Sequence, residues 1–200
     1  MIDITNIDNS EPYNIFKNYY DLALKKGQKV IEAISISSYN KTLKEVRSRN
    51  VNLKYIRNNE WIFFSNYNSN KAKDFESHDQ ISALIYWSEI NVQISLRAIT
   101  HKTNYEVSDD HFAQRSNKKN ALAISSFQSK KIGSYEDAVS NYEKIYRSNE
   151  DLSKRPNYWG GFSFVPYYIE FWEGHASRIN KRIAFEFNNN NEWTKYFLQP

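Results

Sequence analysis

The sequence predicts a mainly β protein, a barrel with peripheral helices, for two reasons. Apolar residues alternate with a period of two from Val30 to about Thr103, and the alternation returns between Phe162 and Leu198 after a helical stretch. Antiparallel strands followed by helices and a terminal hairpin are typical of a barrel that carries its helices outside. With 200 residues and no internal repeat or linker, the chain fits one domain, residues 1–200.

The N-terminal region predicts one helix and then a series of strands. Residues 1–10 are expected to form a mobile tail. Glu11-Pro12 begins a helix with one apolar face, which ends near Gly27. The strands that the alternation predicts next span residues 30–37, 43–56, 61–65 and 81–87.

The fourth and fifth strands differ in pattern. Residues 81–87 are apolar at odd-numbered and even-numbered positions alike, which predicts that this strand lies in the centre of the sheet. Residues 92–98 alternate cleanly, so one face should meet the core and the other should meet water, a partner or a ligand. A short helix from Ser69 to about Ser77 interrupts the strands, with Ser69 as its N-cap.

The C-terminal half predicts helices followed by a return to strands. Residues 106–125 and 134–148 are expected to be helical, and Ser134-x-x-Asp137 suits a capping turn. A run of asparagines at 188–191 should form the last turn. The strands predicted here span residues 162–172, 178–187 and 193–198.

Composition excludes several classes of protein. There is no cysteine, and the four histidines are scattered, so a metal site is not expected. Five glycines cannot build a dinucleotide or Walker loop. The net charge is +4, but 27 basic residues are interleaved with 23 acidic ones, which favours a solvated surface over nucleic acid binding. No stretch is long enough to span a bilayer, so we expect a cytoplasmic protein without membrane contact.

The most specific feature is a set of three motifs in the last quarter of the chain. They are Arg155-Pro156-x-x-Trp159-Gly160-Gly161, Pro166-x-x-Ile169-Glu170-Phe171-Trp172-x-Gly174 and Arg178-Ile179-x-x-Arg182. They resemble the C-terminal signature of the pyridoxamine 5'-phosphate oxidase superfamily, which includes the flavin oxidases of phenazine biosynthesis. The resemblance spans roughly residues 11–200. It implies a homodimeric, FMN-binding split β-barrel, with the FMN site in a barrel core of residues 28–130 and a dimerisation and flavin-contact region in residues 155–200.

Upstream motifs extend the resemblance to the cofactor site. The segment 49–54 is similar to the family's Arg-x-Val-x-Leu-Lys, and 64–71 is similar to its Tyr-Thr-Asn-x-x-Ser-Arg-Lys. A strand that runs into a helix N-terminus is suited to phosphate, because free backbone N–H groups and the helix dipole favour an anion. Taken alone, Arg49 and Lys54 could simply be solvated cations on an edge strand. The cofactor contacts that the resemblance implies are Arg49, Asn50, Val51, Lys54, Phe64, Ser65, Asn70, Lys71, Gln93, Gln128, Ser129, Trp172 and Arg182.

The substrate side departs further from the family pattern. A tyrosine of the vitamin B6 oxidases is replaced by His111, a serine by Lys119, and a histidine by Asn180. Cations at Lys54, Arg115 and Lys119 could still bind an anion through charge-assisted hydrogen bonds. The substrate-binding residues that the resemblance implies are Lys54, His111, Arg115, Lys119, Arg178 and Asn180.

The resemblance implies an FMN-dependent oxidase that transfers a hydride from a small, planar, anionic heterocycle to the flavin and then passes electrons to O2. The segment 123–129 and the C-terminal residues 197–200 are more similar to the phenazine-type oxidases, which favours a secondary-metabolite substrate. Two alternatives stay open at this point. One is a pyridoxine/pyridoxamine 5'-phosphate oxidase that makes pyridoxal 5'-phosphate, and the other is a flavin-binding protein with a degenerate substrate site.

Overall fold

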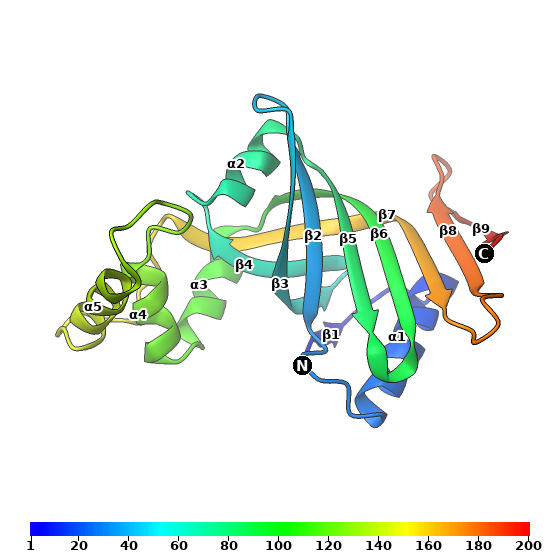
Figure 1. Ribbon diagram of the computed structural model, residues 1–200, viewed down its shortest axis with the longest axis horizontal. Helices are drawn as coiled ribbons and strands as arrows, with labels where there is room; N and C mark the ends of the chain where they lie inside the picture. Colours follow the sequence, from blue (N-terminus) through cyan, green and yellow to red (C-terminus); the bar gives the residue numbers. More distant parts are fainter.

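The computed structural model describes residues 1–200 and shows nine strands in one sheet, with helices around it (Figure 1). The strands are β1 (Asp3–Thr5), β2 (Ala33–Asn40), β3 (Glu45–Arg57), β4 (Glu60–Asn66), β5 (Gln80–Trp87), β6 (Val92–Lys102), β7 (Trp159–Glu173), β8 (Lys181–Phe187) and β9 (Trp193–Leu198). The helices are α1 (Glu11–Lys25), α2 (Asn70–Ser77), α3 (Tyr105–Ala113), α4 (Asn117–Ser125) and α5 (Tyr135–Tyr146), with a short 3₁₀ turn at Ser88–Ile90. The mainly β class with peripheral helices is therefore confirmed.

The strand pairing closes on itself through β4. The sheet runs in the order β1-β3-β2-β5-β6-β7-β8-β9, and β4 pairs with both β3 and β7. This double pairing is possible because β3 and β7 are long, with 13 and 15 residues, so each can pair with different neighbours along its length. The strands β8 and β9 continue outward from β7 as a terminal hairpin (Figure 1).

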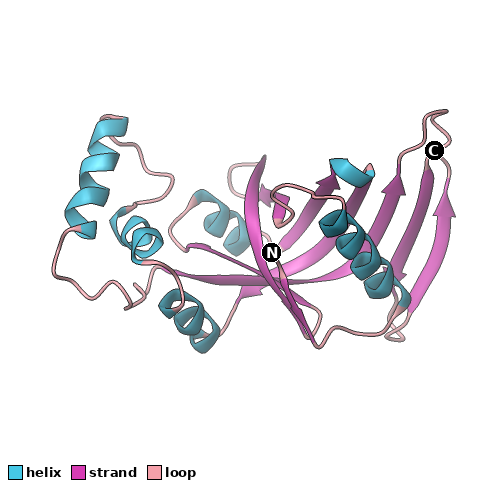
Figure 2. Ribbon diagram, turned by 90° about the horizontal axis from the view of Figure 1, so that it is seen from below, coloured by secondary structure: helices cyan, strands magenta, loops and turns pink.

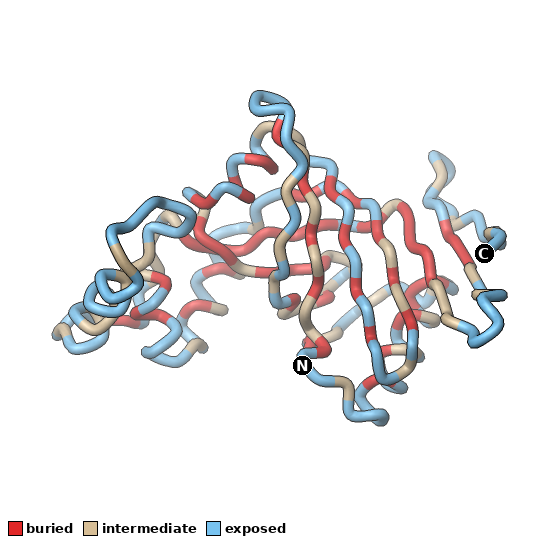
Figure 3. Tube along the Cα trace, in the orientation of Figure 1, coloured by how far each residue is buried: buried red, intermediate tan, exposed pale blue.

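The core lies on one face of this sheet. Buried residues alternate along β5 and β6, and Figure 3 shows the same alternation of buried and exposed positions along the sheet. Helix α1 lies across the concave face (Figure 2). Its Phe16 packs against Trp61 and Trp87, with ring centroids 4.7 and 5.8 Å apart. Burial of these large rings supplies much of the hydrophobic stabilisation of a chain with low mean hydropathy.

The central position predicted for residues 81–87 is confirmed, because β5 lies between β2 and β6. Its two faces nevertheless have different surroundings. Ile81, Ala83 and Ile85 are buried in the core, whereas Leu84 and Tyr86 point to the opposite face and are exposed. Because residues on both faces of β5 are apolar, the outer face of the single chain keeps an uncovered apolar surface.

Several predicted boundaries were wrong for local reasons. Residues 3–5 of the expected tail form β1, which pairs in parallel with β3, and three residues give no recognisable alternation. The expected helix at 106–125 is two helices, because the chain turns between Ala113 and Asn117. The strand expected from residue 178 begins at Lys181, since Arg178 has a φ of 65° and lies in a loop.

Helices α3, α4 and α5 lie at one end of the molecule, away from the terminal hairpin (Figure 1). A small cluster of Phe112, Ala123 and Trp159 attaches α3 and α4 to the beginning of β7. Asn120 is buried, and its Nδ2 donates to the carbonyl oxygens of Phe112 at 3.1 Å and Leu152 at 2.9 Å. This amide fixes the turn between α3 and α4. Helix α5, in contrast, has no buried residue.

None of the helices combines the length and the apolar character that crossing a bilayer requires.

Candidate functional site

A cavity of about 580 Å³ lies between the sheet and the turn that joins α3 to α4. Its walls come from β3, β4, the first turn of α2, the α3–α4 region and the beginning of β7. The residues that line it are Asn50, Val51, Asn52, Lys54, Tyr55, Phe64, Ser65, Lys71, His111, Gln114, Arg115, Ser116, Lys119, Gln128 and Trp159. The cavity therefore brings together residues that are far apart in the sequence, and most of them belong to the predicted site.

One end of the cavity, here called the α2 end, is formed by Ser65, Lys71 and Gln128. Lys71 is buried, and its Nζ donates to Ser65 Oγ at 2.9 Å, Gln128 Oε1 at 3.2 Å and Ser69 Oγ at 3.3 Å. All of these partners are uncharged. Burial lowers the pKa of Lys71 to about 8, and the neighbouring Arg49 contributes to this shift. A buried ammonium held by neutral groups beside a helix N-terminus is suited to a phosphate.

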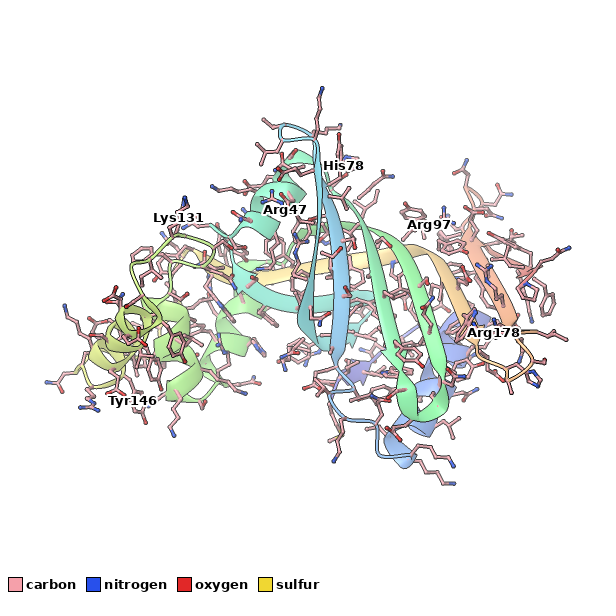
Figure 4. The ribbon with its side chains drawn as sticks, in the orientation of Figure 1. Arg47, His78, Arg97, Lys131, Tyr146 and Arg178 are labelled. Atoms are coloured by element: carbon pink, nitrogen blue, oxygen red, sulfur yellow. The ribbon has the colours of Figure 1, made fainter.

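Arg49 lies behind the α2 end, where its guanidinium contacts Asp74 rather than the cavity. Its Nη2 donates to Asp74 Oδ2 at 3.1 Å, and its Nη1 donates to Ser38 Oγ at 2.7 Å. Asp74 is fully buried and also accepts from Ser38 and Asn40, at 2.9 and 3.0 Å, and from Arg47. Figure 4 shows Arg47 beside α2. Two arginines of β3 are thus fixed to α2 by one carboxylate, and sequence patterns did not reveal this partner.

The opposite end, here called the α3 end, carries three cations: Lys54, Arg115 and Lys119. Arg115 Nη2 donates to the backbone carbonyl of Lys119 at 2.8 Å, while its Nη1 is buried and has no hydrogen-bond partner. The guanidinium lies 4.3 Å from the ring centroid of Trp159. Burial lowers the pKa of Arg115 to about 10. An unpaired buried donor of this kind favours an anionic ligand.

Aromatic rings line the wall between the two ends. The His111 and Phe64 rings are stacked, with centroids 3.8 Å apart and planes inclined by 10°. Phe64 and Trp159 lie nearly parallel at 5.5 Å. Burial lowers the pKa of His111 to about 4, and the nearby cation Arg115 adds to this effect. The cavity wall is thus aromatic and largely uncharged, which suits a planar ligand.

The position of Trp159 depends on the motif that follows the α5 region. Arg155 Nη1 donates to the carbonyl oxygen of Trp159 at 2.6 Å, and its Nε donates to Asp109 on α3. The two glycines that follow permit close packing, because a side chain at Gly160 would collide with Tyr67 and one at Gly161 would lie 2.5 Å from Thr103 Oγ1. This motif therefore acts in the structure by setting Trp159 against the cavity.

A second group of predicted cofactor residues lies away from the cavity, on the outer face of the sheet. Gln93 of β6, Trp172 of β7 and Arg182 of β8 are direct cross-strand neighbours in one row. Arg182 Nε donates to Glu170 Oε1 at 2.7 Å, and Glu170 also accepts from Tyr168 at 2.8 Å. Within one chain, the predicted cofactor residues thus form two separate groups.

The remaining predicted residues lie at the edges of these groups. Asn70 is exposed, and its backbone N–H donates to Ser129 Oγ at 3.4 Å. Arg178 and Asn180 lie in the loop between β7 and β8, where Asn180 Oδ1 accepts from the backbone N–H of His175 at 3.0 Å. Figure 4 shows Arg178 at the end of the molecule opposite to Lys131. The loop that carries Arg178 and Asn180 therefore does not reach the cavity of its own chain.

Comparison with solved structures shows that this fold occurs in other proteins. The fold is similar to that of PhzG from Burkholderia lata 383, solved in complex with tetrahydrophenazine-1-carboxylic acid, with a TM-score of 0.89, 23% identity, and coverage of 96% of this chain and 93% of that one. It is also similar to a pyridoxamine 5'-phosphate oxidase-related, FMN-binding protein from Nostoc punctiforme PCC 73102, with a TM-score of 0.78, 12% identity, and coverage of 92% and 97%.

Sequence comparison identifies the family of the chain, which the likeness in fold does not. A family model described as "Pyridoxine 5'-phosphate oxidase C-terminal dimerisation region" matches residues 159–200. The pyridoxine/pyridoxamine 5'-phosphate oxidase of Leptospira biflexa is 32% identical over 191 residues, which cover 95% of this chain and 89% of that protein. The corresponding oxidase of Colwellia psychrerythraea is 31% identical over 194 residues, with 96% and 88% covered. The chain belongs to the pyridoxine/pyridoxamine 5'-phosphate oxidase family.

Proposed function

We propose that this protein is an FMN-dependent oxidase that acts as a homodimer and oxidises a small, planar, anionic heterocycle, with O2 as the final electron acceptor. The observation that carries the proposal is the cavity itself. It places a buried ammonium with uncharged partners at the α2 end, a guanidinium with one unpaired nitrogen at the α3 end, and a wall of aromatic rings between them. This arrangement suits two anionic groups joined by flat ring systems.

The residues of the α2 end fit the phosphate of FMN. Lys71 and Ser65 would hold it beside the first turn of α2, with Arg49 supplying a further positive charge from β3. Gln128, which now bonds Lys71, would orient the cofactor through its amide. When bound, FMN supplies a ring that accepts a hydride and returns electrons to O2. Asn50, Val51, Phe64 and Ser129 would complete the contacts along β3, β4 and the segment after α4.

A second copy of the chain would complete the site. Gln93, Trp172 and Arg182 lie in a row on the outer face of the sheet, and none of them lines the cavity of its own chain. The same face exposes Leu84 and Tyr86, and the family model that matches the C-terminal region is one of dimerisation. We infer that the row faces the flavin of the partner, and that Arg178 and Asn180 reach the partner's substrate in the same way.

At the α3 end, the chain's own residues would bind and orient the substrate. Arg115, Lys54 and Lys119 would attract its anionic group, and the rings of Phe64 and Trp159 would exclude water from its flat faces. No acidic residue lines the cavity. The site therefore favours a substrate whose charge is negative.

Two substrate classes compete for this site. The altered residues His111, Lys119 and Asn180 and the phenazine-type segments favour a secondary-metabolite substrate. The named relatives at 31 and 32% identity favour pyridoxine 5'-phosphate or pyridoxamine 5'-phosphate. A flavin-binding protein without a substrate is the remaining candidate.

Turnover by FMN-loaded protein separates the candidates. O2 uptake would be followed with pyridoxine 5'-phosphate and, separately, with reduced tricyclic carboxylates of the dihydrophenazine class. We expect uptake with the carboxylates and slow formation of pyridoxal 5'-phosphate. Rapid formation of pyridoxal 5'-phosphate would instead assign the vitamin B6 reaction. Reducible bound flavin without uptake on any substrate would leave only the binding function, and protein that binds no FMN would refute the proposal.

A further inference from the structure

A tyrosine that the sequence analysis did not select makes the closest polar contact in the aromatic wall. Tyr55 follows Lys54 on β3, and its hydroxyl lies 2.7 Å from Nδ1 of His111 on α3. Both residues line the cavity. This bond joins β3 of the sheet to α3 within the wall of the cavity.

Packing fixes both rings. The His111 ring is stacked on Phe64 at 3.8 Å, and Tyr55 stands edge-on to His111 and to Phe64, with centroids 5.4 and 6.0 Å away. Arg57 covers the Tyr55 ring, with its guanidinium carbon 3.8 Å from the centroid. Neither ring can rotate without losing these contacts, so the bond has a defined geometry.

Burial, together with the surrounding charges, keeps both partners neutral. The charged groups that act on the pair are the cations Arg115, Lys54, Lys119 and Arg57 and, on Tyr55, the carboxylates Asp3 of β1 and Asp110 of α3. Burial and these cations hold the pKa of His111 near 4, so the imidazole is uncharged at neutral pH, and burial raises the pKa of Tyr55. A neutral imidazole has one N–H and one lone pair.

The hydrogen-bond pattern favours one position for that proton. The Tyr55 hydroxyl has no protein acceptor other than His111 Nδ1, so donation to that nitrogen is the one arrangement that pairs its proton within the chain. In that arrangement the imidazole proton is on Nε2, which bonds no other residue of the chain, and His111 lines the cavity. The ring would then offer a neutral N–H donor beside the cations of the α3 end.

We propose that Tyr55 is a positioning residue that fixes the tautomer of His111, and that the Nε2–H of His111 joins Arg115 in binding an oxyanion of the substrate, either phosphate or carboxylate. This inference rests on the proposed function for the identity of the ligand. The pair would determine specificity by geometry, since a neutral donor recognises the direction of an oxygen lone pair, whereas the cations around it respond mainly to charge.

The test uses FMN-loaded, full-length protein and three variants. Tyr55→Phe removes only the hydroxyl and retains the ring contacts. His111→Gln retains an N–H donor at a similar reach, and His111→Phe retains the stacking on Phe64 without any donor. Binding of sulfate, pyridoxal 5'-phosphate and phenazine-1-carboxylate would be measured by changes in the flavin spectrum, and the last two probes separate phosphate from carboxylate. Nitrogen-15 NMR of labelled histidine would report the His111 tautomer.

We expect Tyr55→Phe to leave FMN affinity unchanged, to weaken oxyanion binding about tenfold, and to replace a single Nε2–H tautomer by a mixture. His111→Gln should retain most of the affinity, whereas His111→Phe should lose at least as much as Tyr55→Phe. Sulfate keeps its charge between pH 5 and 8, and the pKa of His111 is lowered to about 4. The affinity of the wild type for sulfate should therefore show no effect of His111 protonation in that range.

Three outcomes would overturn the inference: an Nδ1–H tautomer in the wild type, a tautomer unchanged in Tyr55→Phe, or equal oxyanion affinity in His111→Gln and His111→Phe. A purely structural role for Tyr55 would lower the melting temperature without changing the tautomer. If the protein binds no FMN, the proposed function fails by itself. The tautomer and calorimetric sulfate binding by the unloaded protein would then still test the pair.

Discussion

The two ends of the cavity are built on different principles. The α2 end rests on a buried charge cluster, in which Asp74 ties Arg47 and Arg49 to α2 while Lys71 is held by neutral side chains. The α3 end has no buried carboxylate, and Arg115 has a donor without a partner. The α2 end is therefore preorganised by the protein itself. The α3 end retains a buried donor that an anionic ligand would pair.

The strongest test of this contrast removes the carboxylate at the α2 end. Asp74→Ala leaves two half-buried arginines without their shared buried partner, and loss of one member of a fully buried ion pair typically costs about 3–5 kcal/mol. We expect the free energy of unfolding, measured by urea titration, to fall by up to that amount. Glu76→Ala on the same helix is the matched control, since its exposed pair with Lys102 should contribute less than about 1 kcal/mol. If both changes lowered the free energy of unfolding equally, the α2 end would not be stabilised by a buried charge cluster.

A second test separates the ends by ligand. Arg49→Ala should weaken FMN binding roughly tenfold, because it removes the positive charge that Arg49 places behind the phosphate site from its pair with Asp74. Arg115→Ala should leave FMN affinity nearly unchanged and weaken binding of anionic substrates. Flavin fluorescence titration measures the first quantity. If FMN affinity is unchanged in Arg49→Ala, or falls equally in both variants, Arg49 has no particular role in cofactor binding.

The smallest expected effect is a dependence on pH that comes from Lys71. Its pKa is lowered to about 8 in the native state, so the unfolded chain holds this proton up to a higher pH. Between about pH 8 and the ordinary lysine pKa the unfolded state therefore binds more protons, and the contribution of Lys71 to stability rises with pH. FMN affinity should change in the opposite direction, falling as pH rises through about 8, because the phosphate needs the ammonium form.

The comparison with Lys71→Met isolates the contribution of Lys71 from that of every other group that changes its charge in alkaline solution. Both pH trends should be smaller in the variant than in the wild type, as measured by thermal unfolding and by fluorescence titration. An identical pH profile of FMN affinity in the two proteins would show that Lys71 does not contact the phosphate.

Periodicity predicted much of the fold, and its failures have local causes. The alternation in 92–98 identified β6 and its core face, since burial on one side demands it. The break between α3 and α4 was missed because residues 114–116 contain neither glycine nor proline, and the break is stabilised by Asn120, whose partners lie on α3 and near Leu152. A sequence pattern does not show such a long-range contact.

Motif resemblance predicted most of the side chains that line the cavity, but it could not assign them to separate surfaces. Trp172 and Arg182 follow each other closely in the C-terminal motifs, and only the strand register shows that they form a row with Gln93 on the outer face. Asp74 was missed because an acidic residue in a short helix is usually solvated, whereas here its partners come from β2 and β3. Tyr55 was missed because an aromatic residue on a strand is more often part of the core.

The glycine pair at 160–161 has a consequence for the diversification of this cavity. The wall that carries Trp159 has no spare volume, since any larger residue at either glycine meets Tyr67, Ser108 or Thr103. The turn between α3 and α4 presents Gln114 and Ser116 to the cavity, and both residues are exposed. Mutant libraries intended to admit bulkier molecules should therefore vary this turn, and natural variation in the molecules accepted by related proteins should be concentrated there.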